Sequence, residues 1–264
     1  MAMSNQQKYK VTLAGFVITL AGALLFSTKA IIVKLAFKHT AMNALSLLTL
    51  RMLFALPFYL VAAWIAAKAK NTTPLTGRQW GVIVFLGLFG YYLSSLFDFV
   101  GLQYITAGLE RLILFLYPTF AILLNAFIFK QRVNRIQKIA LLLTYTGIAV
   151  AYVGELQLDM NNPDFLWGSF LIFLCSVTFA VYITGSGRII PQVGAGRFTA
   201  YAMLAATTGI FIHFALAGLM PAAGFSGIHW GYGLLLAIVA TVLPSFLISN
   251  GMNRIGSNNV AIIS

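Results

Sequence analysis

Residues 80–104 read Trp80-Gly-Val-Ile-Val-Phe-Leu-Gly-Leu-Phe-Gly-Tyr-Tyr-Leu-Ser-Ser-Leu-Phe-Asp-Phe-Val-Gly-Leu-Gln-Tyr104. This stretch stays apolar over the length, about 20 residues, that an α-helix needs to cross the hydrocarbon core of a bilayer. Its apolar residues follow one another directly, so it lacks the two-residue alternation of a transmembrane β-strand. The stretch therefore predicts a membrane-spanning helix that carries one acidic residue, Asp98.

Seven more apolar runs occupy most of the remaining chain. They are Val11–Phe37, Ala44–Ala67, Leu109–Phe129, Ile136–Val153, Phe165–Gly187, Phe198–Met220 and Trp230–Met252. A ninth run begins near Val260 and reaches the last residue, Ser264. Apolar residues make up 60% of the chain and charged residues only 8%, whereas soluble domains carry about 25% charged residues. The chain is therefore predicted to be an all-α integral membrane protein.

The net charge of +12 comes from short basic clusters between the apolar runs. This pattern is typical of a topology signal and argues against nucleic acid as a partner. The N-terminal segment and every second connection are basic, most strongly at Lys130–Lys138, while Glu155–Asp164 is acidic. Because basic connections stay in the cytoplasm, we place the N-terminus and Lys130–Lys138 inside and Glu155–Asp164 outside. The expected location is a bacterial inner or plasma membrane.

The chain aligns with itself when it is shifted by about 150 residues. Trp80-Gly81 then falls on Trp230-Gly231, and Ser95 falls on Ser245. Each copy holds about five spans, and an odd number of spans turns the second copy upside down, as in many secondary transporters. We therefore predict a first repeat over residues 11–153 and an inverted, incomplete second repeat over 165–264. About eight spans are complete and the ninth is cut short.

One stretch resembles a known family. The sequence from Gly101 to Pro118, GLQYITAGLERLILFLYP, and the basic turn Lys130-Gln131-Arg132 are similar to the EamA-type repeat of the drug/metabolite transporter superfamily. Leu24–Ala36 and the span that contains Arg51 resemble it too, so the resemblance covers nearly the whole chain. It implies about ten spans built as two inverted repeats, cytoplasmic termini, and export of amino acids, nucleosides, sugars or other small metabolites.

Two features depart from the pattern of that family. The turn after the fourth span usually carries an acid, where this chain has Lys130 or Gln131, so a role for that acid does not carry over. The repeat alignment also places Ser264 on Leu114, so the counterpart of Pro118 and the whole tenth span are absent from this sequence. We therefore expect the natural protein to continue for roughly 40 residues.

Signatures of enzymes are absent from the sequence. The chain contains no His-Glu-x-x-His, no Gly-x-Ser-x-Gly, no nucleotide-binding loop and no Cys/His metal spacing. No cofactor or metal site is predicted, and transport must be passive or driven by a gradient. Two alternatives to a carrier stay open, an integral-membrane enzyme and a channel or passive pore.

Ionisable side chains inside the predicted spans are the first candidates for a functional role. They are Lys29, Lys34, Arg51 and Asp98, with Glu110 and Arg111 at the mouth of the fourth span. Lys29 and Asp98 both lie about 27 Å from the cytoplasmic start of their helices, so we predict that they form an ion pair. Lys34 is expected to snorkel to the interface. Arg51 either has a functional role or snorkels in the same way. Glu110 and Arg111 are expected to decorate the outer mouth.

Neutral polar and aromatic side chains complete the predicted substrate-binding or gating set. They are Tyr91, Tyr92 and Ser94 on the third span, Tyr117 and Asn125 on the fourth, and Asn250 on the eighth. Such side chains orient a small ligand; alternatively they hydrogen-bond neighbouring helices or lie in an interfacial belt. His213, on the seventh span, is interpreted as a helix-packing residue.

The sequence favours a secondary transporter that exports a small metabolite by alternating access. The predicted charges sum to a positive value, which favours an amino acid or a similar zwitterion or anion over a lipophilic cation. Asp98 is the strongest candidate to bind a proton, so protons are the candidate coupling ion. The expected partners are this small-molecule substrate and the lipid bilayer; the oligomeric state is not predicted.

Overall fold

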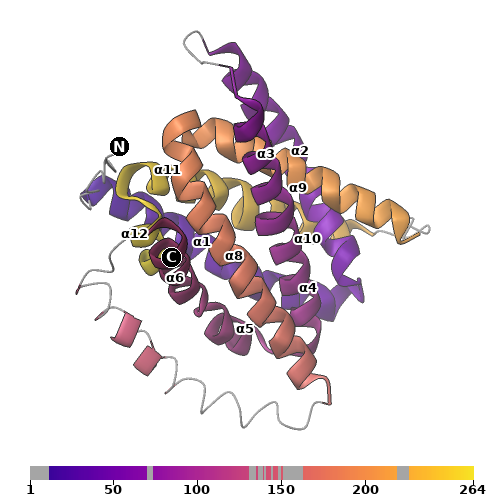
Figure 1. Cartoon of the computed structure of the whole chain (residues 1–264). Helices are drawn as coiled ribbons and strands as arrows, with labels where there is room; N and C mark the ends of the chain where they lie inside the picture. The colour runs from indigo at the N-terminus through magenta and orange to yellow at the C-terminus, as the bar shows by residue number, and fades with distance from the viewer. Residues whose placement is uncertain are drawn as a thin grey trace, which may run out of the picture.

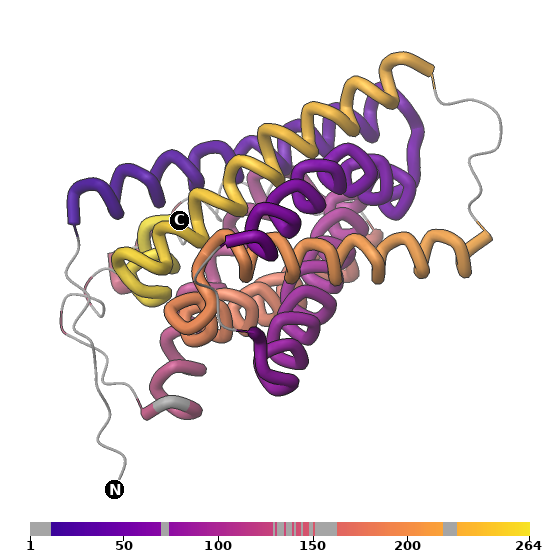
Figure 2. The backbone as a smooth tube through the Cα atoms, turned by 90° about the horizontal axis from the view of Figure 1, so that it is seen from above, coloured from indigo at the N-terminus to yellow at the C-terminus, as the bar shows by residue number. Residues whose placement is uncertain are grey.

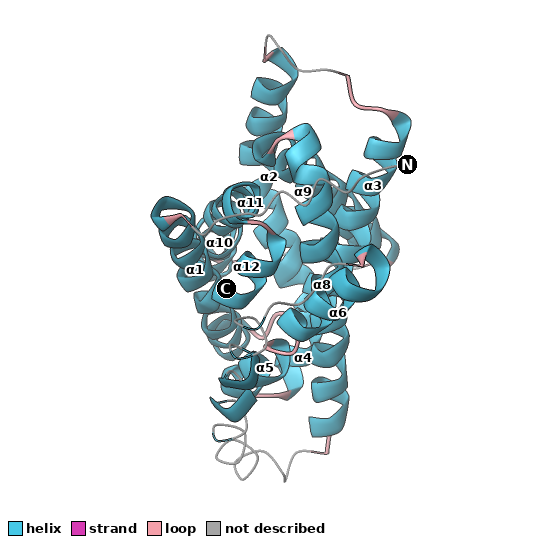
Figure 3. Cartoon of the chain, turned by 60° about the vertical axis from the view of Figure 1, so that its left-hand side comes forward, coloured by secondary structure: helices cyan, strands magenta, loops and turns pink. Residues whose placement is uncertain are grey.

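A computed structural model describes residues 12–69, 74–130, 163–218 and 226–264, with single positions and short stretches between 135 and 150. Within these ranges the chain is almost entirely helical and contains no strand (Figures 1 and 3). Seven helices of this described part are long and apolar enough to cross a membrane. The prediction of an all-α integral membrane protein is confirmed. Most of the predicted fifth span, Ile136–Val153, lies outside the described residues.

The helices follow the predicted apolar runs closely. They are α1 (Leu13–Thr40), α2 (Ala44–Lys68), α3–η1–α4 (Gly77–Phe85, Leu86–Leu93 and Ser94–Tyr104), α5 (Ala107–Leu114), α6 (Tyr117–Phe129), α8 (Phe165–Val193), α9 (Ala195–Leu216), α10–η2–α11 (Gly227–Ala237, Ile238–Val242 and Leu243–Ile255) and α12 (Ser257–Ile263). The sixth run is longer than expected, because α8 continues past Gly187. Gly185 and Gly187 do not end the helix; they let Leu86 and Ser257 approach it closely.

Two spans share the same construction about 150 residues apart. Thr76 and Ser226 each close a capping box at the start of their span, which satisfies the first free backbone N–H groups of the helix. Each span then contains a π-helical segment, η1 or η2, at its middle. This correspondence supports the division that we propose, a first repeat over 11–153 and an inverted second repeat over 165–264.

The core forms between the two proposed repeats. α8 packs along α4, α1 packs along α11, and α2 packs against α9. Figure 2 shows α1 and the α10–α11 span side by side, although they come from opposite ends of the chain. Close packing of α4 and α8 depends on glycine: a Cβ atom at Gly101 would lie 2.6 Å from Ile172 Cδ1. Small residues at such interfaces let membrane helices approach each other.

Large apolar side chains cover the outside of the helix bundle. Leu13, Phe127 and Leu216 are 79%, 79% and 82% exposed, far more than a water-soluble surface of this extent would carry. Lipid tails, by contrast, solvate such side chains without cost. The outside of the bundle is therefore suited to lipid, and charged residues in its interior need partners within the protein.

Candidate functional site: a buried charge cluster

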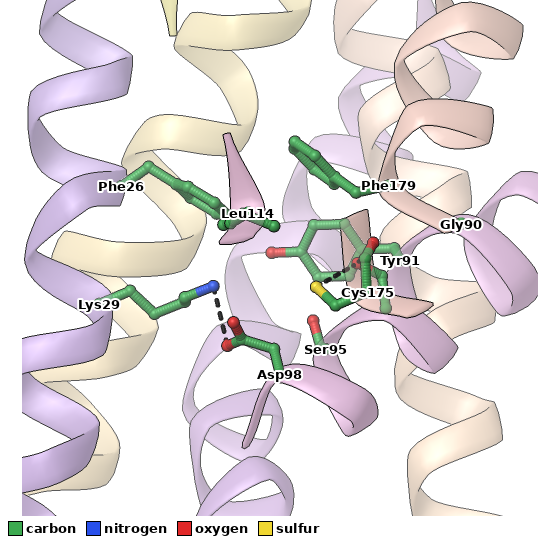
Figure 4. A pocket seen from close by; sticks show the side chains of 10 residues that line it. Phe26, Lys29, Gly90, Tyr91, Ser95, Asp98, Leu114, Cys175 and Phe179 are labelled. Carbon is green, nitrogen blue, oxygen red and sulfur yellow. Dashed lines mark hydrogen bonds and ion pairs between the residues drawn. The ribbon is translucent and has the colours of Figure 1, made fainter. Parts of the chain in front are cut away.

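Four charged side chains meet inside the bundle, and we call Lys29, Asp98, Glu110 and Arg111 the charge cluster. Lys29 Nζ lies 2.8 Å from Asp98 Oδ2 and 3.6 Å from Glu110 Oε1. Arg111 Nε lies 3.3 Å from Glu110 Oε2. Asp98 and Glu110 are fully buried. Figure 4 shows the Lys29–Asp98 contact between α1 and α4. The predicted ion pair is confirmed; its role in transport stays a prediction.

The local sequence explains how α4 and α5 bring two acids together. α4 ends at Tyr104, and Ile105 follows in an extended conformation, with φ −124° and ψ 166°. Thr106 then caps α5 by accepting a hydrogen bond from the backbone N–H of Leu109. The chain thus reverses within two residues and places Glu110, in the first turn of α5, beside Asp98. An acid in the first turn also suits the positive end of the helix dipole.

Glu110 corrects the prediction of a residue that only decorates the outer mouth. The sharp reversal at Ile105 and Thr106 turns Glu110 inward, where its exposed fraction is 0%. Arg111 is partly exposed, and its Nη2 donates hydrogen bonds to the backbone oxygens of Phe26 and Ser27 on α1, at 3.0 and 2.9 Å. Neighbouring residues on one helix turn therefore serve different contacts, both of which join α5 to α1.

Ionic contacts to Lys29 and Arg111 hold the two acids, and the two carboxyl groups also contact each other. An isolated charge in the hydrocarbon region costs several kcal/mol, roughly 3 on insertion scales, so each acid depends on the nearby Lys29 and Arg111. Removal of one member of such a buried group leaves the others uncompensated.

Arg51 lies close to this cluster on α2 and is also buried. Its Nη2 donates a 3.0 Å hydrogen bond to Ser95 Oγ, and its guanidinium carbon lies 4.8 Å from the ring centroid of Phe99 and 5.9 Å from that of Tyr91. The side chain is 1% exposed, so it points into the bundle and does not snorkel. Among the described residues no acid lies within ion-pair distance of it.

Lys34 behaves differently from the expected snorkelling. Its Nζ donates a 2.9 Å hydrogen bond to the backbone oxygen of Leu102, near the C-terminal end of α4. The last carbonyls of a helix have no partner within the helix and carry partial negative charge. Lys34 therefore stabilises the end of α4, the helix that carries Asp98.

Two small cavities adjoin the charge cluster. The smaller cavity, of about 10 Å³, is lined by Lys29, Asp98, Ser94 and Ser95. The larger cavity, of about 40 Å³, is lined by Arg111, Tyr117, Tyr182 and Ser245. Four residues line both cavities: Phe26, Tyr91, Leu114 and Phe179. The smaller cavity has room for about one water molecule. Metabolite sites are typically several hundred Å³, about 300–1,000, so both cavities are closed to a metabolite in this conformation.

Aromatic rings line both cavities. Phe26 stacks on Phe179 with centroids 5.9 Å apart and an interplanar angle of 10°. Tyr117 meets Phe179 edge-on at 5.0 Å. Lys29 Nζ lies 4.8 Å from the Phe26 centroid, and Figure 4 shows Phe26 and Phe179 on the same side of the Lys29–Asp98 pair. We call Phe26 and Phe179 the aromatic partition.

The structure brings three of the neutral candidates to these cavities. Tyr91 lines both, Tyr117 lines the larger one, and Ser94 lines the smaller one. Tyr117 Oη also forms a 2.7 Å hydrogen bond with Ser264 Oγ, and Ser94 Oγ lies 3.3 Å from Cys175 Sγ.

The other three candidates lie elsewhere. Tyr92 hydrogen-bonds His213 on α9 at 2.9 Å, because the next residue after Tyr91 points to another side of the helix. Asn125 donates a 2.6 Å hydrogen bond to Asn258 Oδ1 on α12. Asn250 is exposed and donates to the backbone oxygen of Phe246. These three side chains form hydrogen bonds within or between helices, which is the alternative given for them above.

Comparison with known proteins gives one family. Residues 13–153 match the sequence model of the EamA-like transporter family. The uncharacterized transporter YcbK of Bacillus subtilis (strain 168) is 29% identical over 269 residues, which cover 100% of this chain and 85% of that protein. The uncharacterized transporter YetK of the same organism is 23% identical over 192 residues, which cover 70% of this chain and 57% of that protein.

A solved crystal structure shares the fold. It aligns with a TM-score of 0.71 over 96% of this chain and 83% of that chain. The two sequences are 20% identical, so the likeness concerns the arrangement of the helices and says nothing about the substrate.

Proposed function

We propose that this chain, which belongs to the EamA-like transporter family, is a secondary transporter that carries a small metabolite by alternating access. Its relatives are named as transporters, and its seven long apolar helices make it a multi-pass membrane protein. Both findings point to a transporter rather than an enzyme. The proposal includes export, a bacterial plasma membrane and a cytoplasmic N-terminus.

The observation that carries the proposal is a charged seam between helices. All of its contacts join α1 to α4 or α5: Lys29 to Asp98 and Glu110, and Arg111 to the backbone oxygens of Phe26 and Ser27. We call this set the ionic seam. Both adjoining cavities are too small for a metabolite, so in this proposal they open to it when α1 moves away from α4 and α5. Such a seam can open and reseal, as alternating access requires.

The charges near the seam favour a zwitterionic or anionic substrate such as an amino acid. Three cations, Lys29, Arg51 and Arg111, stand against two acids, Asp98 and Glu110. A buried net positive charge is costly, and a substrate carboxylate would balance it. A lipophilic cation would add to this positive charge, so it is disfavoured unless it displaces one of the cations.

Protons are the coupling ion in this proposal. A proton on Asp98 would remove its attraction to Lys29 and weaken the ionic seam. The Lys29–Glu110 contact and the hydrogen bonds of Arg111 then hold α5 to α1, while α4 has lost its ionic contact with α1. Proton binding and seam opening are thereby linked, which is what coupled transport needs.

Uptake into liposomes tests the proposal. The chain is reconstituted and offered amino acids, nucleosides and cationic dyes in turn, with Asp98→Asn as the variant of the seam. Saturable uptake of an amino acid or another zwitterion or anion is expected. Transport of cationic dyes alone would refute the charge argument, turnover of a substrate without translocation would favour an enzyme, and ion conductance at channel rates would favour a pore.

A further inference from the structure

We propose that Asp98 and Glu110 form a binding site for the primary ammonium group of the substrate, and that Lys29 fills this site as a tethered substitute. The inference rests on the proposed transport function and narrows its substrate class to primary amines, amino acids included. Binding of the substrate then consists of one ammonium group taking the place of another.

The chemistry around Lys29 Nζ is that of an ammonium site. An ammonium group has three N–H donors and no acceptor, and it meets here two acceptor-only groups from different helices, Asp98 on α4 and Glu110 on α5. The Phe26 ring, 4.8 Å from Nζ, adds the attraction of an aromatic face for a cation. Carboxylates and ring faces together are a recurring arrangement for binding amines.

Lys29 occupies this site incompletely. Its Nζ is close to one oxygen of Asp98, but its 3.6 Å distance to Glu110 Oε1 exceeds the usual hydrogen-bond range, about 2.7–3.2 Å. The 2.8 Å contact of Nζ is made with Oδ2 of Asp98 and not with its buried Oδ1. Lysine carries its charge on a flexible four-carbon chain, so the ammonium can leave while α1 keeps its fold. A free amine can approach both acids with better geometry.

The second cavity offers room for the rest of an amine substrate. It is lined by Tyr117 and Tyr182, and it shares Phe26 and Phe179, the aromatic partition, with the ammonium site. Separation of the stacked Phe26 and Phe179 rings would merge the two cavities into one compartment. Arg111 also lines this cavity and is placed to meet a carboxylate, if the amine carries one.

Charge conservation favours exchange over simple addition. When a substrate ammonium replaces that of Lys29, the net charge facing Asp98 and Glu110 stays the same, and no acid is left buried without a cation. A neutral ligand in the same place would leave both acids without Lys29. The site should therefore select for a primary amine and reject its neutral analogues.

Equilibrium binding of phenethylamine tests this inference. Phenethylamine is protonated at neutral pH and joins a primary ammonium to an apolar ring; 2-phenylethanol and N-acetylphenethylamine are its neutral controls. Binding is measured by calorimetry on the chain in lipid nanodiscs. In Lys29→Met, phenethylamine should bind about tenfold more tightly than in the wild type, equivalent to ~1.4 kcal/mol, because the competitor is gone. The neutral analogues should bind weakly to both proteins.

Lys34→Met is the matched control, because Lys34 is also a lysine of α1 but bonds a backbone oxygen. It should leave the affinity unchanged. Adding Asp98→Asn to Lys29→Met should abolish the gain. Unchanged or weaker phenethylamine binding in Lys29→Met, or equal binding of 2-phenylethanol, would overturn the inference.

Lys29→Arg keeps the test open if Lys29→Met fails to fold. A guanidinium donates to both acids in a fixed planar geometry, so it should be a stronger competitor and weaken phenethylamine binding. Tighter binding in Lys29→Arg would refute the inference. Because these are binding measurements, they separate from the transport proposal: amine binding without liposome uptake would refute only the transport function, and uptake without preference for amines only this inference.

Discussion

The two proposed repeats share one backbone plan but carry different chemistry at matching positions. The position of Lys29 corresponds to Phe179, that of Asp98 to Ile248 and that of Arg51 to Tyr201, each about 150 residues on. In the structure Phe179 belongs to the aromatic partition, Ile248 lines the larger cavity and Tyr201 packs against Trp80. The first repeat thus brings the buried charges, and at two of the three matching positions the second brings apolar side chains that line the adjoining cavities.

This difference also separates two helix interfaces. The ionic seam joins α1 to α4 and α5, and the matching interface joins α8 to α11 and α12. At that second interface Gly187 of α8 lies directly against Ser257 of α12, with no space for a side chain. One interface is therefore held by charges that can be exchanged or protonated, and the other by close packing. Substitutions at the two interfaces should have different signatures.

The largest expected effect is loss of an acid from the ionic seam. Asp98→Ala should lower the free energy of unfolding by about 3 kcal/mol, because it leaves Lys29 buried with only the more distant Glu110 as its partner. Thermal unfolding in detergent measures the change. Ile248→Val, at the matching position of the second repeat, should cost about 1 kcal/mol. Equal losses in the two variants would mean that the seam contributes no more than ordinary packing.

The second effect concerns the packed interface. Gly187→Ala should lower the free energy of unfolding by about 2 kcal/mol, since the new methyl group meets the Ser257 side chain. Gly196→Ala on α9 is the control, because nothing lies within 4 Å of the added atom. The loss should not depend on pH or salt. A loss that follows pH would show that this interface also contains an ionic contact.

These comparisons also show what the sequence could predict. The positions of the spans follow from uninterrupted apolar runs, and the Lys29–Asp98 pair follows from equal heights on two helices. The burial of Glu110 does not, because the predicted span began at Leu109 and gave no sign of the reversal at Ile105 and Thr106. The enclosure of Arg51 by Phe99 depends on which helices face each other, and the sequence of one chain does not specify this.

Helical phase explains the remaining differences. Tyr91 and Tyr92 are adjacent in sequence, and only their orientation decides that the first lines the cavities while the second bonds His213. The π-helical segment η1, which contains both residues, changes that orientation locally. A prediction that assumes a regular α-helix cannot assign their faces. Phe26 and Phe179 carry no charge and gave no signal that would separate them from other apolar residues.

A third, smaller effect is the energetic coupling of Lys29 and Asp98. Lys29→Met and Asp98→Asn should each destabilise the chain, and the double variant should be more stable than the sum of the two losses implies, by about 1–2 kcal/mol. Thermal unfolding of the four proteins gives the coupling energy. Additive losses would show that the contact between the two residues is not a stabilising pair.

The smallest expected effect concerns the aromatic partition. Phe179→Leu should lower the free energy of unfolding by about 1 kcal/mol, because it removes the stacking on Phe26 while it keeps an apolar side chain. Phe173→Leu, a ring on the same helix that packs edge-on against Phe120, is the control for loss of an aromatic contact alone. Faster substrate exchange should accompany Phe179→Leu and not Phe173→Leu. If both variants speed exchange equally, the partition does not limit access.

The most direct test of a carrier gated by the ionic seam compares two kinds of amino acid transport in liposomes. The wild type should exchange labelled for unlabelled amino acid and also accumulate it under a pH gradient. Asp98→Asn should keep exchange at a lower substrate affinity but lose the accumulation, because Glu110 still contacts the substrate ammonium while the coupling proton no longer has a site. Undiminished pH-driven accumulation in Asp98→Asn would contradict the role assigned to Asp98 and to the seam.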